Sequence, residues 1–149
     1  MGRALGDLAS RPEWLAELED LSIDCSAAFA AETADRLLSA YGIFAKVQLP
    51  SGMVLWEYEK FRALVGAGAF ESAALTFLNS ACGYMISQGP GGACIATVIL
   101  PGSHHEATAH GDTMALALVG ACAGAFVGAQ VNCKANPIMA GPFESTVRH

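Results

Sequence analysis

The residues best suited to chemistry are crowded into one short segment of this sequence. His104, His105, Glu106, His110 and Asp112 lie within nine residues of one another. Imidazole nitrogens and carboxylate oxygens are ligands that divalent metals accept in proteins. The segment from His104 to Asp112 is therefore a candidate metal site or small-ligand site. It would make the chain an enzyme-like protein that binds a metal or a small ligand.

The spacing of these residues argues against a shared metal ion. The pattern H-H-E-x-x-x-H differs from HExxH, in which two histidines share a helix face and a glutamate lies between them. On a strand, His104, Glu106 and His110 would share one face. At ~3.3 Å per residue, His104 and His110 would then lie about 20 Å apart, too far for one ion. We therefore favour a polar loop followed by an exposed strand face, and we expect no cofactor.

Cysteine chemistry finds little support in the sequence. The chain holds an odd number of cysteines and no CxxC pair: Cys25, Cys82, Cys94, Cys122 and Cys133. This pattern is typical of reduced, mostly buried thiols in the cytosol, so we expect a cytoplasmic protein. A nucleophile at Cys82 or Cys94 would need a site that stabilises its thiolate, and no local signature indicates one.

Three glycines recur at every fourth position of an apolar stretch: Gly120, Gly124 and Gly128. On a helix they share one face, which allows close approach of another element and predicts a packing or self-association face. A homodimer through this helix follows as a hypothesis. The alternative is a membrane-active protein that inserts residues 113–131. Since Met114–Ala129 carries no charge over only sixteen residues, and a spanning helix needs about 20, membrane insertion is disfavoured.

The charge of the chain is unevenly distributed. The formal net charge is −6, and residues 1–35 contain eight acids and two bases. Residues 61–149 contain four acids and three bases, so this part is nearly neutral. Because no basic stripe occurs, we expect no nucleic-acid partner. The acidic segment instead suggests an interaction surface for a basic protein partner, with Glu13, Glu17 and Asp20 as candidate residues.

The first half predicts a helical segment over about residues 11–42. One helix starts at 11–20, where Ser10 is a candidate cap and Pro12 suits the first turn. A second helical pattern covers 24–41, with Gly42 as its stop. Residues 43–49 and 53–58 then resemble a strand pair joined by the turn sequence Pro50-Ser51-Gly52, although residues 57–65 fit a helix equally well. Residues 61–69 form a glycine-containing connection.

The second half predicts an α-β-β-β-α unit over about residues 70–130. Asp112 is the expected N-cap of the last helix, and we expect an irregular tail over 131–149. The order implies one α+β domain with an antiparallel sheet and with helices on one face or on both. The expected elements are a helix at 70–82, strands at 84–88, 93–100 and 106–110, and a helix from 112 to about 130.

Several segments resemble small phage and prophage α/β-sandwich ("ABA sandwich") proteins of unknown function. They are WLAELEDLSIDCSAAFA (14–30), FESAALTFL (70–78), Gly83-Tyr84, ACIATVILPG (93–102) and ATAHGDTMALALVGACAGA (107–125). The sequence departs from that pattern where Tyr84 replaces a tryptophan and Met114 replaces a proline, and residues 40–62 have no counterpart. The resemblance implies a phage or prophage accessory protein, and it transfers no catalytic or binding residue.

Together these features favour a non-enzymatic interaction protein. The expected partners are a second copy of the chain and a host or viral protein, bound through an acidic or an apolar surface. The hydrophobic fraction of 53% and the charged fraction of 15% agree with tight packing or a covered surface, because typical domains carry about 25% charged residues. The aromatic residues Trp14, Trp56, Tyr58 and Phe61 could stack a ligand, but without basic neighbours we expect them to pack.

Overall fold

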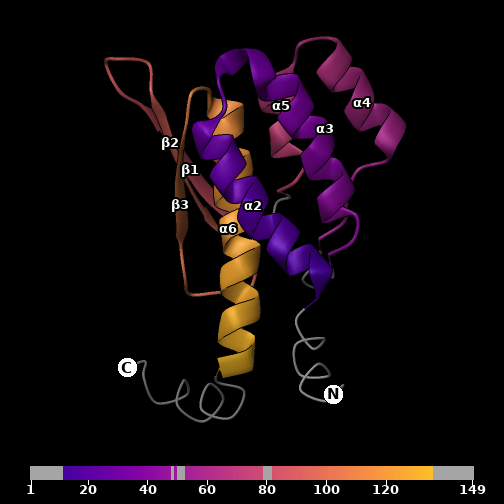
Figure 1. The fold of residues 1–149 in the computed structure, drawn as a ribbon, viewed down its shortest axis with the longest axis vertical. Helices are drawn as coiled ribbons and strands as arrows, with labels where there is room; N and C mark the ends of the chain where they lie inside the picture. Colours follow the sequence, from indigo (N-terminus) through magenta and orange to yellow (C-terminus); the bar gives the residue numbers. More distant parts are fainter. Residues whose placement is uncertain (1–11, 48, 50–52, 79–81, 136–149) are drawn as a thin grey trace, which may run out of the picture.

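A computed structural model describes residues 12–47, 49, 53–78 and 82–135 of this chain. The described residues form an α+β fold, as predicted, in which helices pack against one antiparallel sheet (Figure 1). The elements in chain order are α2 (Glu13–Ala27), the 3-10 helix η1 (Ala30–Glu32), α3 (Thr33–Phe44), α4 (Tyr58–Gly66), α5 (Phe70–Leu75), β1 (Gly83–Gln88), β2 (Cys94–Ile99), β3 (Ala107–Gly111) and α6 (Met114–Ala135).

The sheet is a three-stranded meander with the order β1-β2-β3. Its register is regular, with Ile86 opposite Ala96 and Ala96 opposite Ala109. Alternate residues of β2 are buried, and these face α6: Cys94, Ala96 and Val98. On the other face, Met85 and Ile95 are exposed. The helices therefore cover one face of the sheet, which decides between the two arrangements that the element order allowed.

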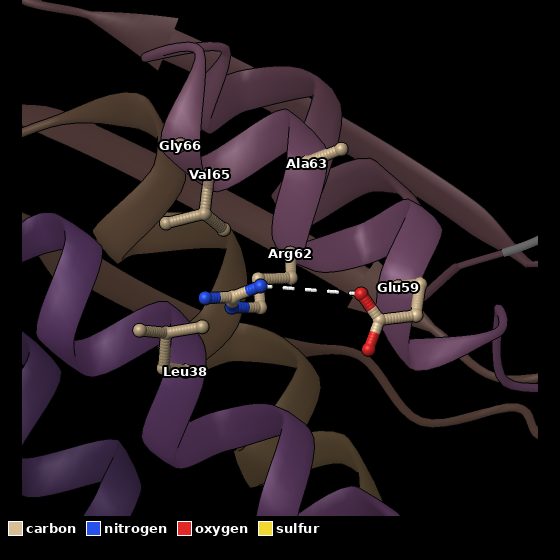
Figure 2. Close-up of a pocket in the computed structure, with 6 residues that line it drawn as sticks. All are labelled: Leu38, Glu59, Arg62, Ala63, Val65 and Gly66. Atoms are coloured by element: carbon tan, nitrogen blue, oxygen red, sulfur yellow. Dashed lines mark ion pairs between the residues drawn. The ribbon is translucent and has the colours of Figure 1, made fainter.

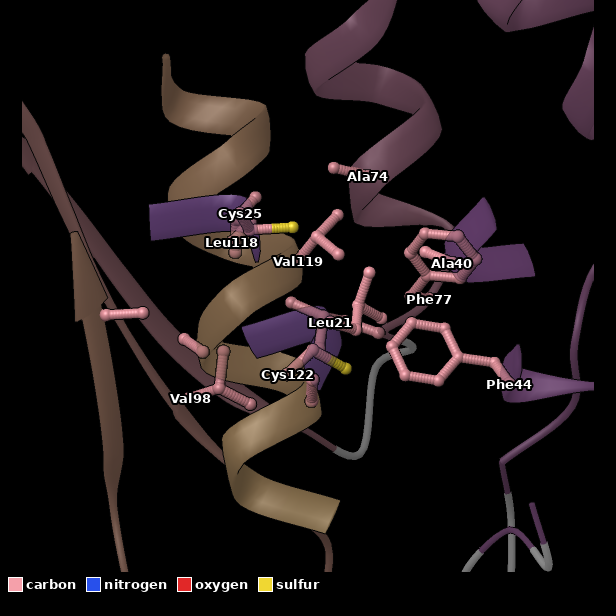
Figure 3. Packing of buried hydrophobic residues seen from close by; sticks show 14 of the residues in the cluster. Leu21, Cys25, Ala40, Phe44, Ala74, Phe77, Val98, Leu118, Val119 and Cys122 are labelled. Carbon is pink, nitrogen blue, oxygen red and sulfur yellow. The ribbon is translucent and has the colours of Figure 1, made fainter. Parts of the chain in front are cut away.

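Helix α6 forms the centre of the core. Its residues from Ala115 to Ala123 are all buried, because α6 lies between the sheet and the remaining helices (Figure 3). On the side away from the sheet, the ring of Phe44 packs against those of Phe77 and Phe126, with ring centroids 4.7 and 5.4 Å apart. Burial of such a side chain contributes about 1.5–3 kcal/mol. The apolar surface on all sides of α6 is thus explained by its contacts within the chain.

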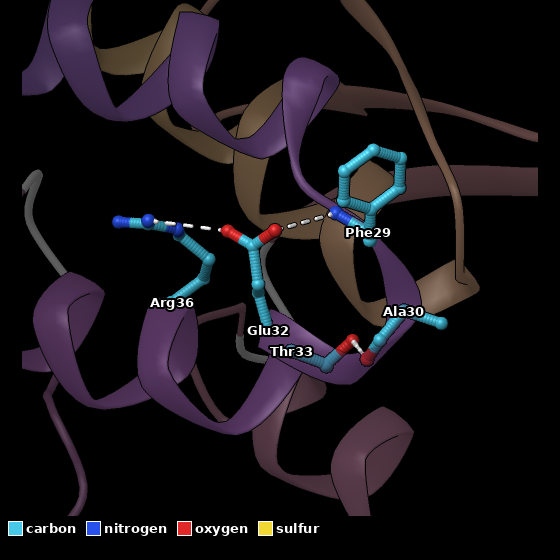
Figure 4. A network of polar contacts seen from close by, with 5 residues as sticks. All are labelled: Phe29, Ala30, Glu32, Thr33 and Arg36. Atoms are coloured by element: carbon cyan, nitrogen blue, oxygen red, sulfur yellow. Dashed lines mark hydrogen bonds and ion pairs between the residues drawn. The ribbon is translucent and has the colours of Figure 1, made fainter.

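The connection from α2 to α3 is held by a small polar network (Figure 4). The Glu32 carboxylate accepts the backbone N–H of Phe29 at 3.1 Å and pairs with the Arg36 guanidinium at 3.4 Å. The Thr33 hydroxyl donates to the carbonyl of Ala30 at 2.8 Å. The first contact satisfies the N–H of Phe29 at the N-cap of η1, one of the groups that a helix start leaves without a partner in the helix. Together these contacts fix the turn that brings α3 back against α2.

The expected strand pair in the first half is wrong. Residues 43 and 44 belong to α3, and residues 53–57 form no strand in the described structure. The alternative for residues 57–65 is confirmed, since α4 covers Tyr58–Gly66 and replaces most of the expected connection at 61–69. The expected turn residues Pro50, Ser51 and Gly52 lie outside the described residues.

The helix boundaries in the first half also differ from the prediction. Helix α2 is continuous to Ala27, so the break falls at residues 28–29 and not near residue 22. Gly42 does not end α3, which continues to Phe44. A glycine costs a helix about 1 kcal/mol, whereas the burial of Phe44 contributes more than that. The expected capping residue Ser10 lies outside the described residues.

In the second half the order of elements is confirmed, and the errors concern where helices begin and end. Helix α5 ends at Leu75, followed by a turn in which the Thr76 hydroxyl donates to the Ala73 carbonyl at 2.7 Å. Helix α6 extends to Ala135, so the expectation of an irregular tail is wrong for residues 131–135, and residues 136–149 lie outside the described part.

The N-cap of α6 is Thr113 and not Asp112. The Thr113 hydroxyl accepts the Leu116 backbone N–H at 3.1 Å, which is the geometry of a side-chain cap. The Asp112 carboxylate points elsewhere and accepts the Ala30 backbone N–H at 2.6 Å. Asp112 and Thr113 are both residue types that commonly cap helices. Because the Asp112 carboxylate bonds the distant residue Ala30, Thr113 is the one that caps α6.

Candidate functional site

The structure separates the residues of the candidate metal segment. His104, His105 and Glu106 lie in the loop before β3, and His110 lies on β3 itself. Because β3 begins at Ala107, His104 and Glu106 precede the strand and share no strand face with His110. The Ser103 hydroxyl instead accepts the His105 backbone N–H at 3.1 Å, which holds the loop in a local turn.

These side chains do not converge on one point. His110 lies opposite Ile95 on the outer face of the sheet, and Asp112 is engaged with the backbone of Ala30. Among the residues that the structure describes, no group of three or more histidine, cysteine, aspartate and glutamate side chains is placed to hold a metal ion. The segment from His104 to Asp112 therefore provides a tether to the start of α3 and an exposed strand, not a set of convergent ligands.

The described cysteines occupy apolar surroundings. Cys25, Cys94 and Cys122 are buried, and these three and Cys82 are free thiols. Burial raises the pKa of Cys25 to about 12, and the charge of Arg36 opposes this effect. Burial also raises the pKa of Cys122, and burial together with the Asp112 and Glu71 charges raises that of Cys94. A reactive cysteine needs a lowered pKa, so these environments disfavour nucleophilic chemistry at Cys94.

The glycine face of α6 is largely used inside the chain. A Cβ added to Gly120 would lie 3.2 Å from the Cβ of Ala109 and 3.5 Å from that of Cys25. A Cβ on Gly124 would lie 3.5 Å from that of Ala107. These two glycines thus serve the packing role, because they let α2 and β3 approach α6. Only around Gly128, among the three, would an added Cβ meet no atom within 4 Å.

The structure divides the acidic candidates of α2 into two kinds. Glu13 and Asp20 are exposed, as the prediction of an acidic surface requires. The Glu17 carboxylate, by contrast, accepts two hydrogen bonds from the Lys46 ammonium, at 2.8 and 3.1 Å. Exposed ion pairs of this kind contribute about 0–1 kcal/mol. Glu17 therefore links α2 to the residues after α3, and Glu13 and Asp20 remain the candidates for contact with a partner.

A cluster of exposed apolar side chains lies where residues 53–58 run beside α3. Val54, Trp56 and Tyr58 are 72%, 47% and 42% exposed, whereas Met53 and Phe61 are buried. Val54 and Trp56 are both directed outward, and Leu55 between them is partly buried. Of the four aromatic residues expected to pack, Phe61 is buried and Trp14 packs against the core, whereas Trp56 and Tyr58 are largely exposed.

Tyr41 of α3 holds this segment in place. Its hydroxyl donates to the Trp56 carbonyl at 2.6 Å, and its ring packs edge-on against Tyr58 with 5.0 Å between centroids. The ring of Phe61 lies 4.9 Å from that of Tyr41 on the buried side. The role of Tyr41 was not predictable from the sequence. Nothing in the local pattern around Tyr41 shows that Trp56, fifteen positions later, will lie against it.

A shallow hollow of about 410 Å³ opens beside Tyr41, between α3 and α4 (Figure 2). Leu38, one helical turn before Tyr41, forms one side, and Ala63, Val65 and Gly66 of α4 form the other. Glu59 and Arg62 also line it, 3.9 Å apart and largely exposed, with the Arg62 side chain reaching between Leu38 and Val65 (Figure 2). We call the hollow and the neighbouring residues Val54, Trp56 and Tyr58 the α3–α4 surface.

Helix α6 was the candidate for membrane insertion. Over the described ranges, no helix combines the length and the apolar character that crossing a membrane requires. Comparisons with known proteins add no family or activity to this geometry: no protein-family model, no curated protein and no solved structure matches this chain.

Proposed function

We propose that this chain is a non-enzymatic interaction protein that binds a protein partner through the α3–α4 surface. The observation that carries the proposal is the exposure of Val54, Trp56 and Tyr58 together, on a segment that Tyr41 already holds in position. Tryptophan, tyrosine and arginine are the residues that most often dominate binding energy at protein interfaces. The accessory role in a phage or prophage, and location in the cytoplasm, remain predictions from the sequence.

The chemistry of the surface indicates an apolar partner. Trp56 and Tyr58 provide flat, rigid contact area, and the hollow beside them is large enough for an apolar side chain. Glu59 and Arg62 line the hollow with largely exposed charges, which affect specificity and the rate of association more than affinity. Binding through this surface would therefore persist at high salt. Binding through Glu13 and Asp20, the acidic alternative, would be lost because salt screens exposed charges.

Affinity capture followed by mass spectrometry tests the proposal. The full chain is compared with the double variant Val54→Asp/Trp56→Ala, at low and at high salt. A matched control, Ile23→Asp/Phe29→Ala, removes an exposed aliphatic side chain and an exposed aromatic ring from a different part of the molecule. Circular dichroism verifies that each variant is folded.

We expect the full chain and the control to capture the same partner at both salt concentrations. The Val54→Asp/Trp56→Ala variant should capture it at least about tenfold less well, the loss expected when interface anchors are removed. Equal capture by that variant, or a partner that is lost at high salt, would contradict the proposed surface. Recovery of no partner by the full chain would contradict the proposed function.

A further inference from the structure

Strand β1 is an open edge of the sheet. Within the described residues its one strand neighbour is β2, with which it forms six consecutive pairs without a bulge. Tyr84 is 49% exposed on the side of the helices, and Met85 is 70% exposed on the outer side. An edge strand carries a row of backbone donors and acceptors that can pair with another strand.

The register identifies which backbone groups of β1 point outward. The Gly89 N–H donates to the Ala93 carbonyl at 2.9 Å, so this opposite pair is a hydrogen-bonded one. Hydrogen-bonded pairs alternate along an antiparallel ladder, so Met85 and Ser87 direct their backbone groups at β2. The N–H and C=O groups of Tyr84, Ile86 and Gln88 consequently point away from the sheet.

The usual protection of an edge strand is missing from β1. Natural edges are guarded by charged side chains, prolines or bulges, which prevent pairing with other chains. The strand Gly83–Gln88 contains no charge and no proline, and no charged residue occurs between Glu71 and Glu106. This neutrality removes the repulsion that the net charge of −6 would otherwise produce between two copies at this edge.

We infer that β1 pairs with β1 of a second copy of this chain. The two strands run antiparallel about a two-fold axis at Ile86, so that Ile86 lies opposite Ile86 and Tyr84 lies opposite Gln88 of the other copy. In this register each pair exchanges N–H···O=C bonds in both directions, and all the outward groups of the three residues are satisfied. The two sheets become one continuous sheet with both sets of helices on the same side.

Three observations indicate that the partner of the β1 edge is a second copy of this chain. A two-fold interface must be complementary to itself, and a neutral strand whose outward donors and acceptors match under a two-fold axis meets this condition. The opposite edge is not available for the same purpose, since the His110 carbonyl of β3 already accepts the Ser26 hydroxyl at 3.2 Å. The pairing also joins the exposed Met85 and Ile95 of both copies into one apolar face. This interface differs from the helix interface suggested by Gly120 and Gly124.

Disulfide cross-linking tests the register directly. In a hydrogen-bonded antiparallel pair the Cα atoms lie about 5.5 Å apart, within the ~4.4–6.8 Å that a disulfide spans. Ile86→Cys should therefore give covalent dimers on mild oxidation. Met85→Cys is the matched control, because two copies of residue 85 would be diagonal neighbours about 7–8 Å apart, and the wild type shows the background from native cysteines. Equally rapid cross-linking of Met85→Cys, or no excess over wild type for Ile86→Cys, would overturn this pairing.

A proline variant tests the edge without new cysteines. Gln88→Pro removes an outward N–H and leaves the bonds to β2 intact, whereas the control Gln88→Ala removes the same side chain and keeps the N–H. Sedimentation equilibrium should show a dimer for wild type and Gln88→Ala, and a dissociation constant at least about tenfold higher for Gln88→Pro. Circular dichroism verifies folding. A monomeric wild type, or an unchanged dimer in folded Gln88→Pro, would overturn the inference. A monomer whose captured partner is lost only in Gln88→Pro would assign the edge to a different protein and overturn it as well.

Discussion

Strands β1 and β3 lie on opposite edges of the same sheet, yet they differ in what surrounds them. Helix α2 packs against β3, and the Ser26 hydroxyl satisfies the outward carbonyl of His110. Next to it, the Asp112 carboxylate accepts the Ala30 N–H and joins the end of β3 to the chain before α3. At β1 the outward backbone groups of Tyr84, Ile86 and Gln88 meet no other strand of the described chain. The chain itself covers one edge, whereas within the described residues no strand pairs with the other.

The difference follows from the size of the side chains on the helix side of each strand. On β3 these residues are Ala107, Ala109 and Gly111, which let α6 and α2 come close. On β1 they are the larger Tyr84, Ile86 and Gln88, and Tyr84 remains half exposed. Small residues thus mark the edge that the helices cover, and larger residues mark the edge that they leave open.

The largest effect should come from Gly111→Ala, which tests how closely the β3 side is packed. A Cβ at Gly111 would lie 2.5 Å from the Ala117 backbone nitrogen and 3.0 Å from its Cα, so backbone would have to move. Because overpacking costs about 1–3 kcal/mol, we expect a loss of about 2–3 kcal/mol in the free energy of unfolding, measured by urea denaturation. Gly128→Ala is the control, and with no atom within 4 Å it should stabilise α6 by up to about 1 kcal/mol. A loss below about 0.5 kcal/mol for Gly111→Ala would contradict the close packing of this edge.

The buried thiol of Cys25 predicts a smaller, pH-dependent effect on the same side. Burial raises the pKa of this thiol from 9.0 to about 12 in the folded chain. Above pH 9.0 the unfolded chain therefore loses a proton that the folded chain keeps, and the free energy of unfolding falls by about 1.4 kcal/mol per pH unit for this group. Urea denaturation on each side of pH 9.0 should show a shallower decline for Cys25→Ala than for wild type. The buried thiol of Cys122 is present in both wild type and Cys25→Ala and affects them equally. Equal declines in the free energy of unfolding of the two proteins would therefore contradict a raised pKa of Cys25 in the folded chain.

The second half of the fold was predictable because its signals are local. Strand β2 is rich in apolar and β-branched residues, and the turn between β1 and β2 contains Gly92 at φ 93°, a conformation that favours glycine. The uncharged, apolar sequence of α6 indicates a buried helix, and its contacts with the sheet and the helices agree with this. Each of these patterns is determined by residues a few positions apart.

The first half was less predictable because its structure depends on distant contacts. The ring of Phe44 at the end of α3 packs against Phe77 and Phe126. The pattern of residues 43–49 gives no sign of these contacts, because both partners lie more than thirty positions later. Tyr41 bonds the Trp56 carbonyl and the Trp56 side chain is 47% exposed, so an aromatic residue expected to pack became part of the proposed binding surface. For the candidate metal segment, the spacing in the sequence already argued against one shared ion, and the start of β3 at Ala107 placed His104 and Glu106 in the preceding loop.

The smallest effect concerns the tether at the end of β3. Asp112→Ala removes the acceptor that bonds the Ala30 N–H at 2.6 Å, and a hydrogen bond at such an exposed position contributes about 1 kcal/mol. Urea denaturation should therefore show a loss of that size, whereas the control Asp20→Ala, on the exposed side of α2, should change stability by less than about 0.5 kcal/mol. Hydrogen exchange of the β3 amides should also become faster in Asp112→Ala and remain unchanged in β1, because only the β3 edge depends on α2 and its connection to α3. Equal acceleration in both strands would mean that the chain does not close one edge of the sheet more firmly than the other.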